Sequence, residues 1–321
     1  MVDVQAFGVS RTAMMTAAGL VLTAVIVIGT IALIGGPDFA NAAYLGMMFL
    51  VSAIRRLPRR QQLLAAVWAA GVSFLGVQMA GSDRWSILLV LIAVCIGQGV
   101  FASGSVAAIS GSPVNFVVFS GFEPGSSPWH AAVGTLLGAL LIIAAAYIAR
   151  LTPTRHPLPA RQAFEYGVVL GFGCVLIVGV MDLFGLPRVT WALLAFCLIF
   201  VPDPYEHPGQ IGERILGTAL GAVAVTALAS FLPTPLVVVL LLVCAILALA
   251  YLEEDKRLLY ISLLTPTVIL MASLTESARV VDLGVQRVIA VLIAGAVAGA
   301  LHFALRKYHQ WLYRDPTGAA A

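Results

Sequence analysis

Long apolar stretches alternate with short polar or charged ones along the whole chain. A helix needs about 20 residues to cross the hydrocarbon core of a bilayer, and cutting the sequence at its charged and Pro- or Gly-rich points gives twelve candidate spans. They cover approximately residues 12–34, 39–54, 61–80, 85–101, 104–121, 129–149, 163–183, 188–201, 212–231, 234–251, 258–273 and 284–306. Two of them, 39–54 and 188–201, are short enough to be tilted, interfacial or broken. The pattern predicts an all-α integral membrane protein with about 12 transmembrane helices.

Composition narrows the class further. Hydrophobic residues make up 61% of the 321 residues, charged residues only 10%, and the mean hydropathy is +1.01, far outside the range of a soluble globular domain. The net charge of +3 is too small and too dispersed for a nucleic-acid partner. The four cysteines lie within apolar runs without C-x-x-C spacing, so we predict buried or lipid-facing thiols, no metal site and no cofactor. An apolar run from Thr12 to Ile34 is too long for a signal-peptide core, and we expect it to remain as the first span.

The Lys and Arg residues fall unevenly on the two sides of the predicted spans. With a cytoplasmic N-terminus, only four of the 18 lie outside, namely Arg84, Arg188, Arg279 and Arg287, and the other 14 are cytoplasmic. Positively charged loops are retained on the cytoplasmic side. The pattern therefore predicts cytoplasmic N- and C-termini and an even number of spans in a bacterial inner membrane.

The segment RLTPTRHPLPARQ, residues 150–162, divides the chain into two sets of six predicted spans. RQQLLAAVWAAGVSF in the first set resembles GERILGTALGAVAVT in the second, at an offset of roughly 150 residues. Six is an even number, so two such repeats would be parallel, related by an axis along the membrane normal. We predict one repeat over residues 1–156 and another over 157–321. The alternative is that any two helices rich in Ala, Leu and Gly look alike.

Two predicted spans carry a proline flanked by polar residues at matching places in the two halves, GSPVNFVVFS at 111–120 and LLTPTVILMAS at 263–273. A proline frees backbone groups that hydrocarbon cannot satisfy, so such a break persists only inside protein or beside water. Paired interrupted segments favour a substrate site near the membrane midplane. Its predicted residues are Ser112, Pro113, Asn115, Thr265, Pro266 and Thr267. The alternative is a kink repaired by Ser or Thr hydroxyls, without any ligand.

A second stretch, from Thr190 to Leu228, is more specific. A Trp-led short apolar span, a proline-ended loop and then R-I-L-G-T-x-x-G-A resemble the fusaric-acid-resistance and aromatic-acid-exporter (FUSC) superfamily, to which aluminium-activated malate transporters are also related. The residues that carry the resemblance are Trp191, Pro202, Arg214, Gly217, Thr218 and Gly221. The chain resembles a short form without the large cytoplasmic domain of long members. The resemblance implies export of small, often aromatic, carboxylic acids, in many members alongside a periplasmic adaptor protein.

The chemistry of this motif can also be read from its residues. Gly217 and Gly221 lie on one face of a helix and let another backbone approach, with Thr218 able to donate a hydrogen bond across the contact. We therefore expect helix packing there. Arg214 has two interpretations: a positive residue that anchors the helix at the cytoplasmic interface, or a two-pronged clamp for a carboxylate.

Other titratable residues give weaker indications. Glu165 follows Arg161 by four residues, which favours a boundary ion pair over a proton relay. His302 is a weak candidate for proton coupling, because histidine exchanges protons near neutral pH, yet it lies close to the interface. We see no enzyme motif such as a Walker loop, H-E-x-x-H or G-x-S-x-G.

The sequence thus leaves three function classes open. The leading one is a secondary transporter exporting small organic anions, followed by a passive anion channel of similar build and by a non-catalytic membrane assembly subunit. The predicted partners are a small organic anion and the lipid bilayer, with a periplasmic adaptor and a homodimer left as open alternatives.

Overall fold

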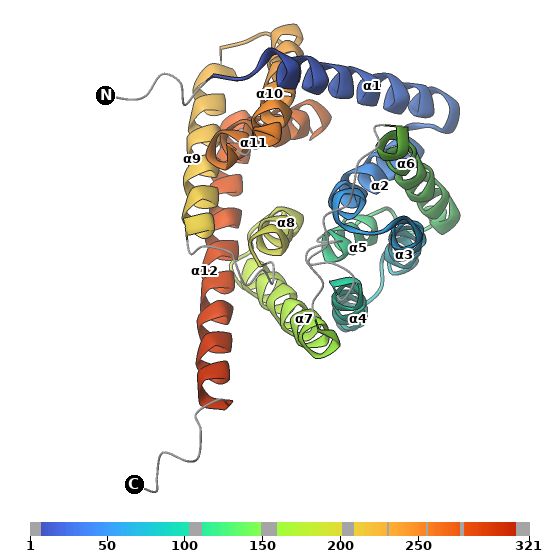
Figure 1. Ribbon diagram of the computed structural model, residues 1–321, viewed down its shortest axis with the longest axis vertical. Coiled ribbons are helices and arrows are strands. Elements are labelled where there is room, and N and C mark those ends of the chain that lie inside the picture. The colour runs from blue at the N-terminus through green and yellow to red at the C-terminus, as the bar shows by residue number, and fades with distance from the viewer. Residues whose placement is uncertain are drawn as a thin grey trace, which may run out of the picture.

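The computed structural model describes residues 8–102, 111–148, 159–200, 209–229, 231–254, 256–276 and 279–312. Every regular element in these ranges is a helix (Figure 1). They are α1 (Arg11–Gly35), α2 (Pro37–Arg56), α3 (Arg59–Gln78), α4 (Arg84–Ala102), α5 (Ser112–Ser120), α6 (Pro128–Ile148), α7 (Ala160–Leu183), α8 (Val189–Ile199), α9 (Gly209–Ala229), α10 (Thr234–Glu253), α11 (Arg257–Glu276) and α12 (Val280–Leu312).

Each predicted span overlaps one of these helices, but residues 104–110 of the span 104–121 lie outside the described residues. The prediction of an all-α membrane protein is confirmed for the described residues. Eight helices are long and apolar enough to cross a membrane: α1, α4, α6, α7 and α9 to α12. The remaining four do not meet that standard within the described residues, and α5 and α8 have only 9 and 11 residues. The protein is therefore multi-pass. The predicted boundary between residues 156 and 157 lies outside the described residues.

Local sequence accounts for where the helices begin. Ser10 caps α1 because its Oγ accepts a hydrogen bond from the backbone N–H of Ala13, at 3.2 Å. Gly36 turns the chain between α1 and α2 at a φ of 85°, a conformation that glycine adopts without steric cost. Pro37 then occupies the first turn of α2, where a missing N–H costs no helical hydrogen bond.

The helices pack in two groups, one from each half of the chain, and within the described residues three main pairs of helices join the groups. In the first half, α2 packs on α6, and α3 packs on both α5 and α6. In the second half, α9 packs on α11 and α12, and α10 packs on α11. Contacts of α4 with α7, of α1 with α10 and of α5 with α8 join the two halves. In Figure 1, α1 extends from α10 toward α2 and so bridges the halves at one end of the view.

The largest apolar cluster lies where α4, α7, α8 and α12 meet. Within it, the ring of Phe200 stacks on Phe196 at 5.3 Å and 10°, and on Tyr166 of α7 at 6.2 Å and 16°. This column of three rings is almost fully buried. Cys95 and Cys174 belong to the same cluster, and all four cysteines of the chain are buried and free.

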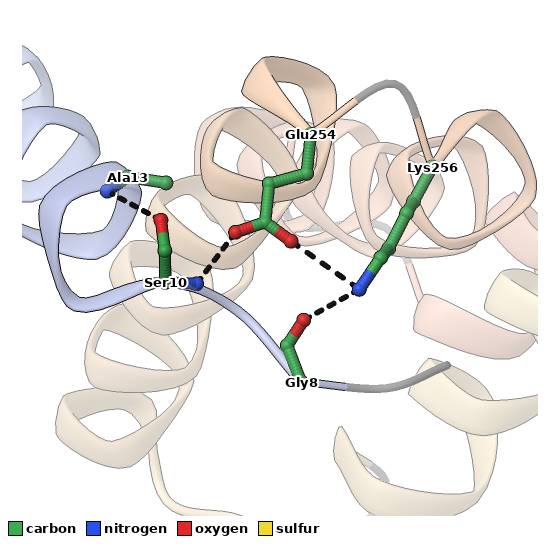
Figure 2. A network of polar contacts seen from close by, with 5 residues as sticks. All are labelled: Gly8, Ser10, Ala13, Glu254 and Lys256. Atoms are coloured by element: carbon green, nitrogen blue, oxygen red, sulfur yellow. Dashed lines mark hydrogen bonds and ion pairs between the residues drawn. The ribbon is translucent and has the colours of Figure 1, made fainter. Parts of the chain in front are cut away.

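A polar contact ties the start of α1 to the connection between α10 and α11 (Figure 2). Glu254 accepts a hydrogen bond from the backbone N–H of Ser10, and its other oxygen lies 3.2 Å from Nζ of Lys256. The Lys256 ammonium in turn donates to the carbonyl of Gly8. The Ser10 N–H, followed by Lys256, lowers the pKa of the Glu254 carboxyl. We call these four residues, Gly8, Ser10, Glu254 and Lys256, the N-terminal clasp.

Candidate functional site

The predicted site residue Ser112 lies in a chain of polar contacts across four helices. Its Oγ accepts a hydrogen bond from Nε1 of Trp68 on α3, at 3.0 Å, and its backbone N–H donates to Oε1 of Gln98 on α4, at 3.1 Å. Nε2 of Gln98 donates to the hydroxyl of Tyr166 on α7, at 3.2 Å. Polar groups of α3 and α4 thus hold the start of α5, and Gln98 extends the chain of contacts to α7 of the second half.

Asn115, one turn further along α5, is buried with one hydrogen-bonding atom left over. Its Nδ2 donates to the carbonyl of Ala69 at 3.3 Å, while its Oδ1 has no hydrogen-bond partner among the described residues. The hydroxyl of Ser73, which donates to the same carbonyl, also shares a hydrogen bond with Thr135 at 2.8 Å. A buried acceptor without a partner costs about 1–3 kcal/mol of folding free energy, so the polar side chain of Asn115 lowers the stability of the fold.

The two proline segments have different local structures. Pro113 lies in the first turn of α5, where its missing N–H is not needed. Pro266 lies inside α11, which continues through it, and removes the hydrogen bond that the Ser262 carbonyl would otherwise accept. The hydroxyls of Thr265 and Thr267 donate to carbonyls of their own helix, each at 3.0 Å. In α11, therefore, the local geometry is that of a hydroxyl-repaired proline helix.

The glycine face of α9 lies against this part of α11. A methyl group at Gly221 would overlap the Ser262 carbonyl oxygen and lie 2.8 Å from Cδ of Pro266. One at Gly217 would lie 3.0 Å from Cβ of Ile261. Thr218, between the two glycines, is 3% exposed. The Ser262 carbonyl, which lacks its helical hydrogen bond because of Pro266, thus lies against the backbone of α9 at Gly221. No side chain of Gly221 separates the two helices there.

Arg214 lies one turn before these glycines and is half-buried. No hydrogen bond or ion pair joins its guanidinium to a carboxylate of the described residues, including the neighbouring Glu213. Glu206, the next acidic residue before it in the sequence, lies outside the described residues. Tyr260 of α11 is close enough to interact with its charge. Pro202 of the same motif also lies outside the described residues.

A hollow of about 340 Å³ lies between the starts of α9 and α11. It is lined by Glu213, Lys256, Arg257, Leu258 and Leu259. The lining contains two cations and one carboxylate, and the Lys256 cation is also paired with Glu254 of the N-terminal clasp. Lys256 is also a member of the N-terminal clasp (Figure 2).

Arg287 is the residue that the sequence analysis missed, because it was counted with the outer loops. It lies in α12 and is only 3% exposed. Its Nη1 donates to the carbonyl of Trp191 at 3.4 Å, and its Nε has no hydrogen-bond partner among the described residues. The spacing of apolar residues could have indicated this burial, because the fully buried Leu283, Ala290 and Ala294 lie on the same face of α12 as Arg287.

The two weak candidates for proton coupling lie apart from these groups. Glu165 forms an ion pair with Arg161, at 2.9 Å between Oε1 and Nε, in the i,i+4 spacing of one helix. His302 is exposed on α12. Neither contacts Arg214, Arg287 or Asn115 through any hydrogen bond found in the described residues.

The family described as fusaric acid resistance protein-like has a model that matches residues 168–300. The matched region contains α8 to α11 entire, with most of α7 and α12, and so includes Trp191, Arg214 and Arg287. The family resemblance found in the sequence is confirmed, and the family is one of membrane transport. No curated protein and no solved structure matches the chain.

Proposed function

Because residues 168–300 belong to a family of membrane transport proteins, we propose that this protein is a secondary transporter of the bacterial inner membrane. Its substrates are small organic carboxylate anions, in particular aromatic ones, and the direction is export. The binding residues that we assign are Ser112, Pro113, Asn115, Thr265, Pro266, Thr267 and Arg214.

The observation that carries the choice of an anion is the charge around the hollow beside Arg214. Lys256 and Arg257 line it, and Arg214 directly follows Glu213, which lines it too. Arg214 forms no ion pair with a described acidic residue, so its charge is available to a ligand. A planar guanidinium binds a carboxylate through two parallel hydrogen bonds. A volume of about 340 Å³ is at the lower end of the range for small-molecule sites.

The pairing of helices supports two parallel repeats, residues 1–156 and 157–321. In this scheme α4 and α10 are the fourth helices of their halves, and α1 and α7 are the first. The contact of α4 with α7 then corresponds to that of α10 with α1. Likewise α3 packs on α5 and α6, as α9 packs on α11 and α12. A two-fold axis along the membrane normal would generate both sets of contacts.

Contacts between the halves also support the proposed orientation. The N-terminal clasp brings together Ser10 and Glu254, which both belong to segments assigned to the cytoplasm. Arg84 and Asp182, assigned to the outer side, form an ion pair at 2.9 Å. Residues assigned to opposite sides of a membrane would be separated by about 30 Å of hydrocarbon.

Two other functions remain candidates for the same architecture. A passive anion channel would use the same cations without coupling to a second ion, and a non-catalytic assembly subunit would move no anion. As protein partners, a periplasmic adaptor protein and a second copy of the chain would fit an exporter of this kind.

The test is flux in proteoliposomes that contain the purified protein and radiolabelled benzoate. Uphill benzoate movement driven by an imposed pH gradient would identify a coupled transporter. Flux that only follows the benzoate gradient and the voltage would identify a channel. No flux above that of protein-free liposomes, for benzoate and for aliphatic acids alike, would contradict both.

A further inference from the structure

Arg287 is a buried positive charge that no described carboxylate neutralises. Asp282, the acidic residue nearest to it along α12, is paired instead with Arg279, at 2.9 Å between Oδ2 and Nε. A buried guanidinium is costly unless it is paired and hydrogen-bonded. Arg287 has only one long hydrogen bond to a carbonyl, and its Nε is open. Such a group is the usual mark of a ligand site in a membrane protein.

A tryptophan ring and a second arginine stand beside this charge. The guanidinium of Arg287 lies 5.6 Å from the centre of the Trp191 ring, and that of Arg188 lies 4.6 Å from it. Arg188 is held there by a hydrogen bond from its Nε to Oε1 of Gln286, at 2.8 Å. It is also the one non-glycine residue with a positive φ in the described chain, 64°. Backbone strain of this kind persists where the surroundings require it.

The surroundings of Trp191 are apolar on two sides. Its ring packs against the central cluster of α7, α8 and α12, and also against the cluster formed by α9, α11 and α12. A small, strongly hydrated anion would lose its water here without compensation. An aromatic acid carries an apolar ring of its own, so only its carboxylate needs the guanidinium.

We propose that Arg287, Trp191 and Arg188 form a binding site for a monovalent aromatic carboxylate, with the carboxylate on Arg287 and the aromatic ring beside Trp191. The class of substrate rests on the proposed function. The new element is a binding site for that substrate between the helices. Arg188 also lies over the Trp191 ring, so we assign to it the role of holding that ring in position. None of these three residues belongs to the proline segments.

Equilibrium binding tests this site without requiring transport. The purified full-length protein in detergent is titrated with benzoate while tryptophan fluorescence is recorded, with cyclohexanecarboxylate, benzamide and chloride as comparison ligands. Benzoate should quench the fluorescence saturably, and Trp191→Phe should abolish that change. Cyclohexanecarboxylate should bind at least threefold more weakly, because it lacks a planar ring, and benzamide and chloride should leave the signal unchanged.

Variants then identify the arginine. Arg287→Gln should weaken benzoate binding at least tenfold and Arg287→Lys by a smaller factor, because lysine keeps the charge and loses the fork. Arg279→Gln is the matched control, since Arg279 precedes the same helix but is exposed and paired, and its affinity should be that of the unchanged protein. Glutamine removes a buried charge, so folding should survive, and benzoate should raise the melting temperature of the unchanged protein but not that of Arg287→Gln.

The outcomes separate this site from the proposed function. Unchanged benzoate affinity in both Arg287 variants, or equal quenching by chloride, would overturn the site even if benzoate flux is present. Saturable quenching that depends on Arg287, in a protein that moves neither benzoate nor aliphatic acids, would keep the site and overturn the transporter.

Discussion

Arg84 and Asp182 form an ion pair with 2.9 Å between Nη2 and Oδ2, and this pair joins α4 of the first half to α7 of the second. Both side chains are about half exposed, and a pair in water contributes at most about 1 kcal/mol. The stronger link lies toward the other end of the same two helices. There, Cα of Gly167 is only 2.8 Å from the position that a methyl group at Gly99 would occupy. The halves are thus joined mainly by close backbone packing, and the ion pair adds to it.

The first prediction concerns topology. Single cysteines placed in residues 55–60 and 150–162 should resist an impermeant thiol reagent in intact cells, because both segments are proposed to be cytoplasmic. A cysteine at position 84 should react under the same conditions. Mass-tag labelling on a gel measures both. Labelling of the 150–162 segment from outside would contradict the arrangement of two six-helix repeats.

A second prediction concerns Asn115. Asn115→Leu suits an apolar environment and removes both the bond to Ala69 and the open acceptor, so it should lower benzoate flux by about tenfold, equivalent to about 1.4 kcal/mol. Abundance in the membrane should stay close to normal. Ser120→Ala is the matched control, since the Ser120 hydroxyl only bonds within α5. Full flux in Asn115→Leu would remove this residue from the site.

The third prediction separates the two interpretations of Arg214. If Arg214 clamps a carboxylate, Arg214→Lys should raise the half-saturation concentration for benzoate efflux roughly 3- to 10-fold, about 0.7–1.4 kcal/mol, because the fork is lost. Insertion should be normal, since lysine keeps the positive charge. If instead half-saturation is unchanged in Arg214→Lys while Arg214→Ala fails to insert, the residue is only an anchor.

The fourth prediction tests the contact between α9 and α11. Gly221→Ala should lower the stability by on the order of 1–3 kcal/mol, because the added methyl group meets the Ser262 carbonyl and the Pro266 ring. Gly212→Ala in the same helix has open space around it and should leave the stability unchanged or slightly raised. The melting temperature in detergent measures both. Equal values for the two variants would show that the helices are not in close contact.

The fifth prediction concerns the N-terminal clasp and pH. The pKa of Glu254 is lowered in the folded protein, so its contribution to stability is present above the unfolded-state pKa and is lost as pH falls through the lower folded-state value. The difference in melting temperature between the unchanged protein and Glu254→Gln should therefore be constant at pH 6–8 and shrink toward zero below about pH 4. A difference that grows as the pH falls would contradict the contact of Glu254 with Ser10 and Lys256.

The helices were predictable from the sequence, because each apolar run is long enough to require one and charges or prolines mark its ends. The two proline segments were not equally predictable. Pro113 and Pro266 have similar neighbours, yet one starts a short helix and the other lies inside a long one. Local sequence gives a partial distinction, because Gly111 and Ser112 before Pro113 are typical of a helix start, whereas the apolar Leu263 and Leu264 precede Thr265 and Pro266.

Arg287 shows the main limit of the charge pattern. Counting Lys and Arg treats every cation as interfacial, whereas the burial of Arg287 depends on Trp191, 96 residues away in the sequence. The resemblance to a known family drew attention to Trp191 and Arg214. Only the fold brings Arg287 beside Trp191 and close enough to Arg214 for their charges to interact.

The stacked rings of Tyr166, Phe200 and Phe196 have an electrical consequence. The buried rings leave no room for mobile ions between them, so part of the membrane voltage would fall across this region of the protein. The interior of a cell is negative, and moving one negative charge outward through that field is favourable by about 2.3 kcal/mol per 100 mV. The voltage would therefore assist export of a monovalent carboxylate past this column, in addition to any coupled ion, and an interior-positive diffusion potential should slow that export.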